Sequence, residues 1–101
     1  MGMTLCQSDL SSLKSRVQAE ISEIRKELLE ISNYLYQNPE TGYQERKAVQ
    51  KLLDAVRTRG FTVTKNLAGL ETAFRATLLG RADGPHVAIM AEYDALPELE
   101  P

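Results

Sequence analysis

The chain has 101 residues, of which 43% are hydrophobic and 26% are charged, and its formal net charge is −2. This length allows one small domain with a modest core. Acidic and basic residues are interleaved along the sequence, and such a pattern argues against a nucleic acid as partner. No apolar run approaches the roughly 20 residues that a membrane helix needs, which argues against a membrane partner as well.

The N-terminal residues point to the cytoplasm. Residues 1–9 lack the basic and apolar regions of a secretory signal. The single cysteine, Cys6, cannot form an internal disulfide, as is typical of proteins in reducing compartments. We therefore expect a cytoplasmic protein. Cys6 is not expected to be a catalytic thiol, because no histidine lies near it in the sequence.

The first predicted element is a long amphipathic helix over residues 8–37. Its apolar side chains recur at steps of three or four residues, which is the helical period. They are Leu10, Leu13, Val17, Ile21, Ile24, Leu28, Ile31 and Leu35. Asn38-Pro39 ends the helix, because a proline forces the residue before it out of the helical conformation. A helix of about 30 residues would extend roughly 45 Å, which is more than the width of a compact domain of this size.

The length of this helix leaves two interpretations open. In the first, residues 28–101 form a domain, the C-terminal half of the helix covers its sheet, and residues 1–27 lie partly outside its core. In the second, helix 8–37 binds a partner or a second copy of the chain. Two successive steps of four residues break a strict heptad, so a long regular coiled coil is not expected.

A second helix is predicted from about Thr41 to Arg59, with Gly60 well suited to the position after a helix. Its apolar face comprises Ala48, Val49, Leu52, Leu53 and Val56. From residue 61 the apolar period changes to two, which predicts strands at 61–64 and 72–79. One face of the second strand would carry Thr72, Phe74, Ala76 and Leu78.

The third predicted strand leads into two carboxylates. Residues 87–91 are all apolar, and Glu92 and Asp94 follow directly. A short apolar run after turn residues is typical of a strand buried on both faces of a sheet. Two helices can cover only part of one face of such a sheet. The fold class is therefore predicted as α/β, with a long N-terminal helix, a second helix and three strands of a larger, incomplete sheet.

Glu92 and Asp94 are the candidate site residues. Side chains alternate along a strand, so both acids are predicted on one side, with Tyr93 opposite. Such a pair could bind a divalent metal, orient a metal-ligating histidine or act as an acid–base pair. Acids at strand ends are also common as helix caps and loop hydrogen-bond acceptors, so the spacing alone leaves both interpretations open. The only histidine, His86, would lie about 20 Å from Glu92 along an extended strand and could not share a metal ion with it.

Three segments together resemble a known family. They are Leu-Tyr-Gln-Asn-Pro-Glu-Thr-Gly-Tyr-Gln-Glu at 35–45, Arg-Gly-Phe-Thr-Val at 59–63 and Val-Ala-Ile-Met-Ala-Glu-Tyr-Asp-Ala-Leu-Pro at 87–97. In this order and spacing they resemble the N-terminal part of the aminoacylase/carboxypeptidase-type zinc metallopeptidases. The sequence is most similar to the amidohydrolase branch, which includes aminobenzoyl-glutamate hydrolases and β-alanyl-lysine dipeptidase-like proteins. The resemblance extends from about Leu28 to Pro97.

The resemblance implies roles for particular residues. Asp94 matches an aspartate that supports a metal-ligating histidine beside the metal centre. Glu92 stands where many relatives have a metal-binding histidine, so it is a near-site candidate and not an assigned ligand. Glu45 matches a position for which a structural role is expected. Residues 28–101 would be the N-terminal portion of a metallopeptidase catalytic domain, truncated before the segment that carries the metal ligands.

The resemblance also implies an activity. A full-length relative would be a metal-dependent hydrolase, in which bound Zn or Mn activates water to cleave the amide bond of N-acyl amino acids or dipeptides. The metal ligands and the general base of that family are missing from the 101 residues, so the chain is expected to bind no metal and to be inactive alone. The alternative is a complete small non-enzymatic protein whose helix over 8–37 mediates self-association.

Overall fold

In a computed structural model of the protein, residues 7–98 are described, apart from the side chain of Ser8. Residues 1–6, which include Cys6 and most of the segment considered for a signal, and residues 99–101 lie outside the described part. The chain divides into two compact units, with the boundary between Ser32 and Asn33. Each unit is considered by itself.

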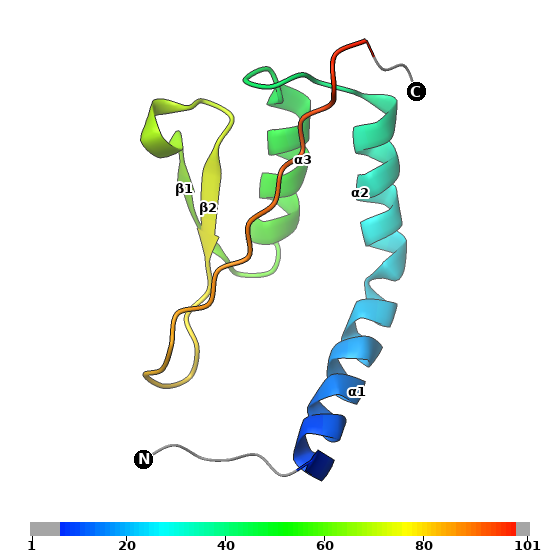
Figure 1. The fold of residues 1–101 in the computed structure, drawn as a ribbon, viewed down its shortest axis with the longest axis vertical. Helices are drawn as coiled ribbons and strands as arrows, with labels where there is room; N and C mark the ends of the chain where they lie inside the picture. The colour runs from blue at the N-terminus through cyan, green and yellow to red at the C-terminus, as the bar shows by residue number, and fades with distance from the viewer. Residues whose placement is uncertain (1–6, 99–101) are drawn as a thin grey trace. The chain divides into compact units, whose positions relative to one another are not determined.

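The N-terminal region is helical, as its apolar period predicted (Figure 1). Helix α1 comprises Gln7–Glu23 and helix α2 comprises Arg25–Gln37. Only Ile24 interrupts the helical assignment, and backbone hydrogen bonds continue across it, from Ile24 to Glu20 and from Leu28 to Ile24. The early members of the apolar stripe, Leu10, Leu13, Val17 and Ile21, are each 41–60% exposed. None of the described helices has the length and apolarity required to span a lipid bilayer.

The second unit is built around helix α3, which comprises Arg46–Arg57. Two of the residues predicted on its inner face, Ala48 and Leu53, are buried, and the others are half-buried. Gly60 follows the helix with a φ of 83°, and the amide of Phe61 bonds to the carbonyl of Val56. This is the left-handed helix ending that a glycine favours, so the predicted role of Gly60 is confirmed.

The start of α3 differs from the prediction, which placed it near Thr41. Tyr43 has a φ of 68°, a left-handed conformation that an α-helix cannot contain. The helix begins only at Arg46. Its first amides are satisfied by the carboxylate of Glu40, which accepts hydrogen bonds from the backbone N–H of Lys47 at 3.0 Å and of Ala48 at 2.8 Å. Residues 41–45 thus form a loop that precedes the helix.

A β-hairpin lies against α3 (Figure 1). Strand β1, Thr62–Lys65, pairs antiparallel with strand β2, Phe74–Thr77, so that Val63 faces Ala76. A short 3-10 helix η1, Leu67–Gly69, occupies the connection. On the predicted face of β2, Thr72 is buried and Phe74 and Ala76 are half-buried, whereas Leu78 lies beyond the strand and is 60% exposed.

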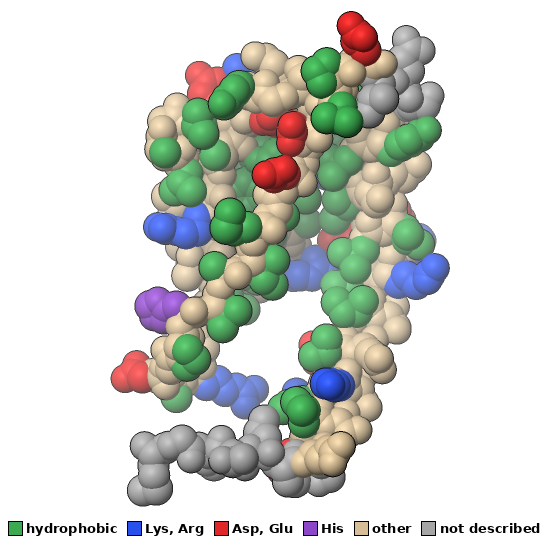
Figure 2. Space-filling view, viewed as in Figure 1, with side chains coloured by type: hydrophobic (Ala, Val, Ile, Leu, Met, Phe, Trp, Pro, Cys, Tyr) green, Lys and Arg blue, Asp and Glu red, His purple; other side chains and the backbone are tan. Residues whose placement is uncertain are grey.

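The predicted third strand is absent from the described residues. The sheet there consists of β1 and β2, and residues 86–96 pair with neither. Val87, Ile89 and Met90 are 85–94% exposed, and hydrophobic side chains stand at the surface along this segment (Figure 2). A strand that is apolar on both faces is stable only between neighbouring strands and covering layers, and residues 7–98 supply none for this segment. The α/β class therefore holds, but the expectation of three strands does not.

Candidate functional site

Three segments of the second unit meet at the N-terminal end of α3. They are the loop 40–45, residues 70–74 before and at the start of β2, and residues 91–95, which we call the Asp94 segment. The backbone N–H of Ala95 donates a hydrogen bond to the carbonyl of Glu40 at 2.7 Å. Together the three segments line an open depression of about 520 Å³.

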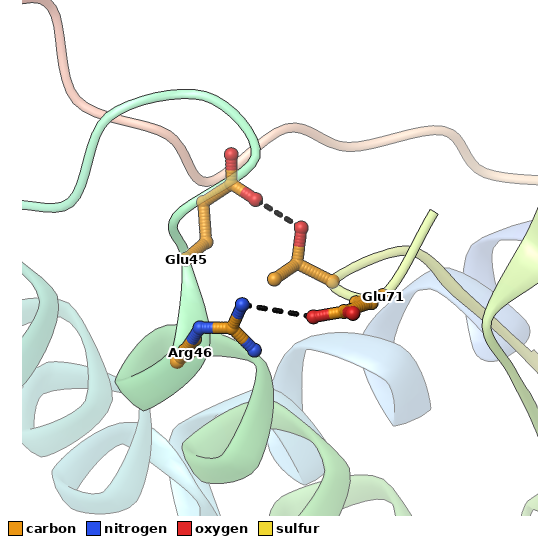
Figure 3. Close-up of polar contacts among 4 residues, drawn as sticks. Glu45, Arg46 and Glu71 are labelled. Atoms are coloured by element: carbon orange, nitrogen blue, oxygen red, sulfur yellow. Dashed lines mark hydrogen bonds and ion pairs between the residues drawn. The ribbon is translucent and has the colours of Figure 1, made fainter. Parts of the chain in front are cut away.

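Glu45 lies at the centre of this junction. Its side chain is only 8% exposed, and one carboxylate oxygen accepts a hydrogen bond from the backbone N–H of Tyr43 at 2.6 Å. The other oxygen accepts a hydrogen bond from the hydroxyl of Thr72, which is 6% exposed (Figure 3). A buried carboxylate is costly unless hydrogen bonds replace its water. Both oxygens of Glu45 have such a partner, which agrees with the structural role expected for this position.

An ion pair runs beside the Glu45–Thr72 contact. Arg46 and Glu71 approach to 2.8 Å, and their side chains are 64% and 69% exposed (Figure 3). Solvent screens a pair of this kind, so it adds little to stability. The buried contact of Glu45 with Thr72 is the stronger link between the two segments.

Tyr93 joins the Asp94 segment to the same junction. Its hydroxyl donates a hydrogen bond to the backbone carbonyl of Thr72, and its ring lies 6.2 Å from the ring of Phe74, tilted by 34°. Burial raises the pKa of the Tyr93 phenol above its ordinary value of 10.0, and the nearby carboxylate of Glu45 raises this pKa further. The phenol therefore keeps its proton at neutral pH and can act as a hydrogen-bond donor.

Glu92 and Asp94, the predicted site residues, are both exposed, and they alternate with the half-buried Tyr93 and Ala95. The segment thus has the alternation expected of a strand although it pairs with none. The carboxylate of Asp94 lies close to Gly42, where a Cβ atom would stand 3.9 Å from an oxygen of Asp94 and 3.9 Å from an oxygen of Glu45. The exposed acid of the Asp94 segment and the buried acid of the loop thus both lie close to this glycine.

The described residues do not form a metal site. No group of three or more His, Cys, Asp or Glu side chains in this part of the chain is placed to hold a metal ion. His86 is exposed and precedes the Asp94 segment by several residues. Of the nearby carboxylates, Glu45 is already occupied by Thr72 and Tyr43. The donors present do not fit Zn or Mn by themselves, so we derive no chemical step through a metal from them.

The sequence pattern did not predict the contacts of three residues at this junction. Tyr93 was identified only as the residue opposite the two acids, yet the same alternation implies that it points inward. Thr72 was assigned to a strand face, with no signal for its contact with Glu45. Glu40 was recognised only as part of the motif at 35–45, and its capping of α3 was not predicted.

Comparison with known proteins identifies relatives, although no family model matches the chain. The chain is 35% identical over 72 residues to one of the subunits of the p-aminobenzoyl-glutamate hydrolase of Escherichia coli, a match of 71% of this chain and 15% of that protein. It is 29% identical over 85 residues to thermostable carboxypeptidase 2 of Saccharolobus solfataricus, covering 84% of this chain and 21% of the relative. It is 28% identical over 91 residues to N-acetyl-L-cysteine deacetylase of Bacillus subtilis, covering 89% of this chain and 21% of the relative.

These matches cover most of the chain, and every one is to an amidohydrolase or a carboxypeptidase. The chain belongs to the amidohydrolase/carboxypeptidase family. The family predicted from the three motifs is thus confirmed. The chain spans only about a fifth or less of the length of these family members.

Proposed function

We propose that the chain is the N-terminal portion of the catalytic domain of a metal-dependent amidohydrolase that cleaves N-acyl amino acids or dipeptides. Relatives named as a hydrolase, a carboxypeptidase and a deacetylase support this reaction class. The observation that carries the proposal is the Asp94 segment, which is tied to the loop 40–45 while its carboxylates stay exposed. We propose a cytoplasmic enzyme, with Zn or Mn as the metal.

In this proposal the chain contributes a residue that orients a metal ligand, and it does not contribute the metal ligands themselves. The exposed carboxylate of Asp94 would accept a hydrogen bond from the ring N–H of a metal-ligating histidine, which fixes the orientation and basicity of that ligand. Glu92 would lie beside the same centre. The metal would be held by ligands that the described residues do not supply, and the chemistry it would contribute is the activation of water. By the resemblance, the metal ligands and the general base of the family are not among these residues, so the 101-residue chain alone is proposed to be inactive.

Two assays test the proposal. The purified chain, with added Zn²⁺ or Mn²⁺, is incubated with a panel of dipeptides and N-acyl amino acids, and no turnover above the metal-only blank is expected. Turnover would overturn the inactivity of the chain. In the second assay, this chain replaces the matching segment of N-acetyl-L-cysteine deacetylase, and the chimera is assayed for hydrolysis.

The chimera tests Asp94 directly. Asp94→Asn should lower its activity by about 10–100-fold, the usual effect of removing a partner of a metal-ligating histidine. Asp83→Asn, at an exposed turn position, is the matched control and should leave activity unchanged. A folded, metal-loaded chimera that has no activity with Asp94 intact would contradict the proposed function, and so would equal activity of the Asp94 variant and the control.

The exposed apolar stripe of α1 favours a second candidate, a non-enzymatic chain that self-associates through this helix. Sedimentation velocity of the purified chain separates the two. A defined dimer that dissociates on Val17→Glu would support association. A monomer at concentrations of tens of micromolar would exclude it as the main role, because the stripe would then have no partner copy.

A further inference from the structure

We propose that Glu45 is a positioning residue, which acts through Thr72 and Tyr93 to hold the Asp94 segment against the N-terminal end of α3. The catalytic meaning of this role rests on the proposed function. The placement of the segment does not, and it can be measured without any activity.

The first link joins Glu45 to Thr72. Both side chains are nearly inaccessible to solvent, and they are 27 residues apart in the sequence. Because Glu45 immediately precedes α3, its position is set by the helix, and the backbone N–H of Val49 bonds to its carbonyl at 3.0 Å. The carboxylate in turn orients the hydroxyl of Thr72 and thereby the backbone that leads into β2.

The second link joins Thr72 to the Asp94 segment. The backbone carbonyl of Thr72 receives the hydroxyl hydrogen of Tyr93, a residue directly adjacent to Asp94. The ring of Tyr93 rests near Phe74, at the start of β2. Thr72 thus contacts Glu45 through its side chain and Tyr93 through its backbone carbonyl.

A backbone contact holds the Asp94 segment at a second position, Ala95. The carbonyl of Glu40 accepts the N–H of Ala95, while the carboxylate of Glu40 caps α3. Tyr93 and Ala95 are therefore both anchored, and the exposed carboxylates of Glu92 and Asp94 stand next to the anchored positions. Since the segment has no strand pairing in the described residues, these contacts are what fixes the direction of Asp94.

The test uses the full chain and reads the Ala95 amide by NMR hydrogen exchange. Tyr93→Phe removes the hydroxyl and keeps the ring, and Thr72→Val removes the hydroxyl that donates a hydrogen bond to Glu45 and keeps the shape. Each should speed exchange at Ala95 about five- to tenfold, the effect of losing one hydrogen bond. Thr72→Ser restores a hydroxyl and should return exchange to within about twofold of the wild type. Glu71→Gln breaks the exposed ion pair between the same two segments and is the matched control, with no expected change.

Three outcomes would overturn the proposal. The first is an Ala95 amide that exchanges at the wild-type rate in both Tyr93→Phe and Thr72→Val. The second is an equal loss of protection at Leu53 in the middle of α3, which would make the contacts a general support of the fold and not a positioning device. The third is failure of Thr72→Ser to rescue Thr72→Val. None of these depends on hydrolysis, so they are distinct from a failure of the proposed function.

In an active chimera the same variants supply a kinetic readout. Tyr93→Phe should lower kcat more than it raises KM, because a displaced Asp94 weakens transition-state stabilisation without removing a substrate contact. An effect on KM alone would contradict a role through Asp94.

Discussion

Replacing Glu40 with alanine removes the side chain that caps α3. The first four amides of an α-helix have no partner within the helix, and the carboxylate of Glu40 serves two of them, Lys47 and Ala48, at 3.0 and 2.8 Å. Loss of a helix N-terminal cap costs about 0.5–2 kcal/mol, and loss of an anion at the positive end of the helix dipole costs about 0.3–1 kcal/mol. One of the two bonds is exposed, so we expect the free energy of unfolding to fall by about 1–2 kcal/mol.

Urea denaturation followed by circular dichroism at 222 nm measures this change. Glu40→Gln keeps one acceptor oxygen without the charge and should lose about half as much. Glu71→Gln is the control, and removing its exposed ion pair should cost less than about 0.5 kcal/mol. The difference between Glu40→Gln and the wild type should shrink at high salt, because salt screens the dipole interaction. A Glu40→Ala protein as stable as the Glu71→Gln control would refute the capping argument.

Two further predictions concern the core and the phenol. Leu53→Ala removes the one large side chain that is 0% exposed among the described residues. It should lower the free energy of unfolding by about 2–3 kcal/mol, which is enough to unfold much of so small a domain. A melting temperature within 2 °C of the wild type would contradict this. Burial raises the pKa of Tyr93 in the folded state, so the stability it contributes is complete below the ordinary value of 10.0 and is lost as the pH rises through the higher folded value. Tyr93→Phe should therefore lose less stability than the wild type between pH 9 and pH 11 in urea titrations, and an identical pH dependence of the two proteins would count against the raised pKa of Tyr93.

Local patterns predicted the helices well. Both the period of the apolar stripe and the endings at Pro39 and Gly60 depend on residues close in the sequence, and the structure has helices that end near those positions. The start of α3 was wrong by five residues, since the loop 41–45 is held by contacts that the period does not reveal. The motif at 35–45 was recognised only by its resemblance, and the pattern did not reveal that one of its acids caps the helix and the other binds Thr72.

The strands show where prediction from the sequence ends. The alternation at 61–64 and in 72–79 correctly predicted the paired strands, because a hairpin finds its partner a few residues away. Residues 87–91 have an equally clear apolar pattern and pair with nothing in the described part of the chain. A central strand depends on partners that are distant or outside the chain, and no local pattern supplies them.

The candidate site was also predicted only as far as local patterns reach. Alternation alone placed Glu92 and Asp94 on one side and Tyr93 on the other, and the exposures of these residues agree with it. What holds the segment could not be inferred from the pattern, because the contacts of Thr72 with Glu45 and with Tyr93 bridge 27 and 21 residues. An exposed apolar segment that pairs with no strand would have no defined direction without them. The buried acid of the first motif therefore acts with the backbone contact between Glu40 and Ala95 to position the exposed acids of the last motif.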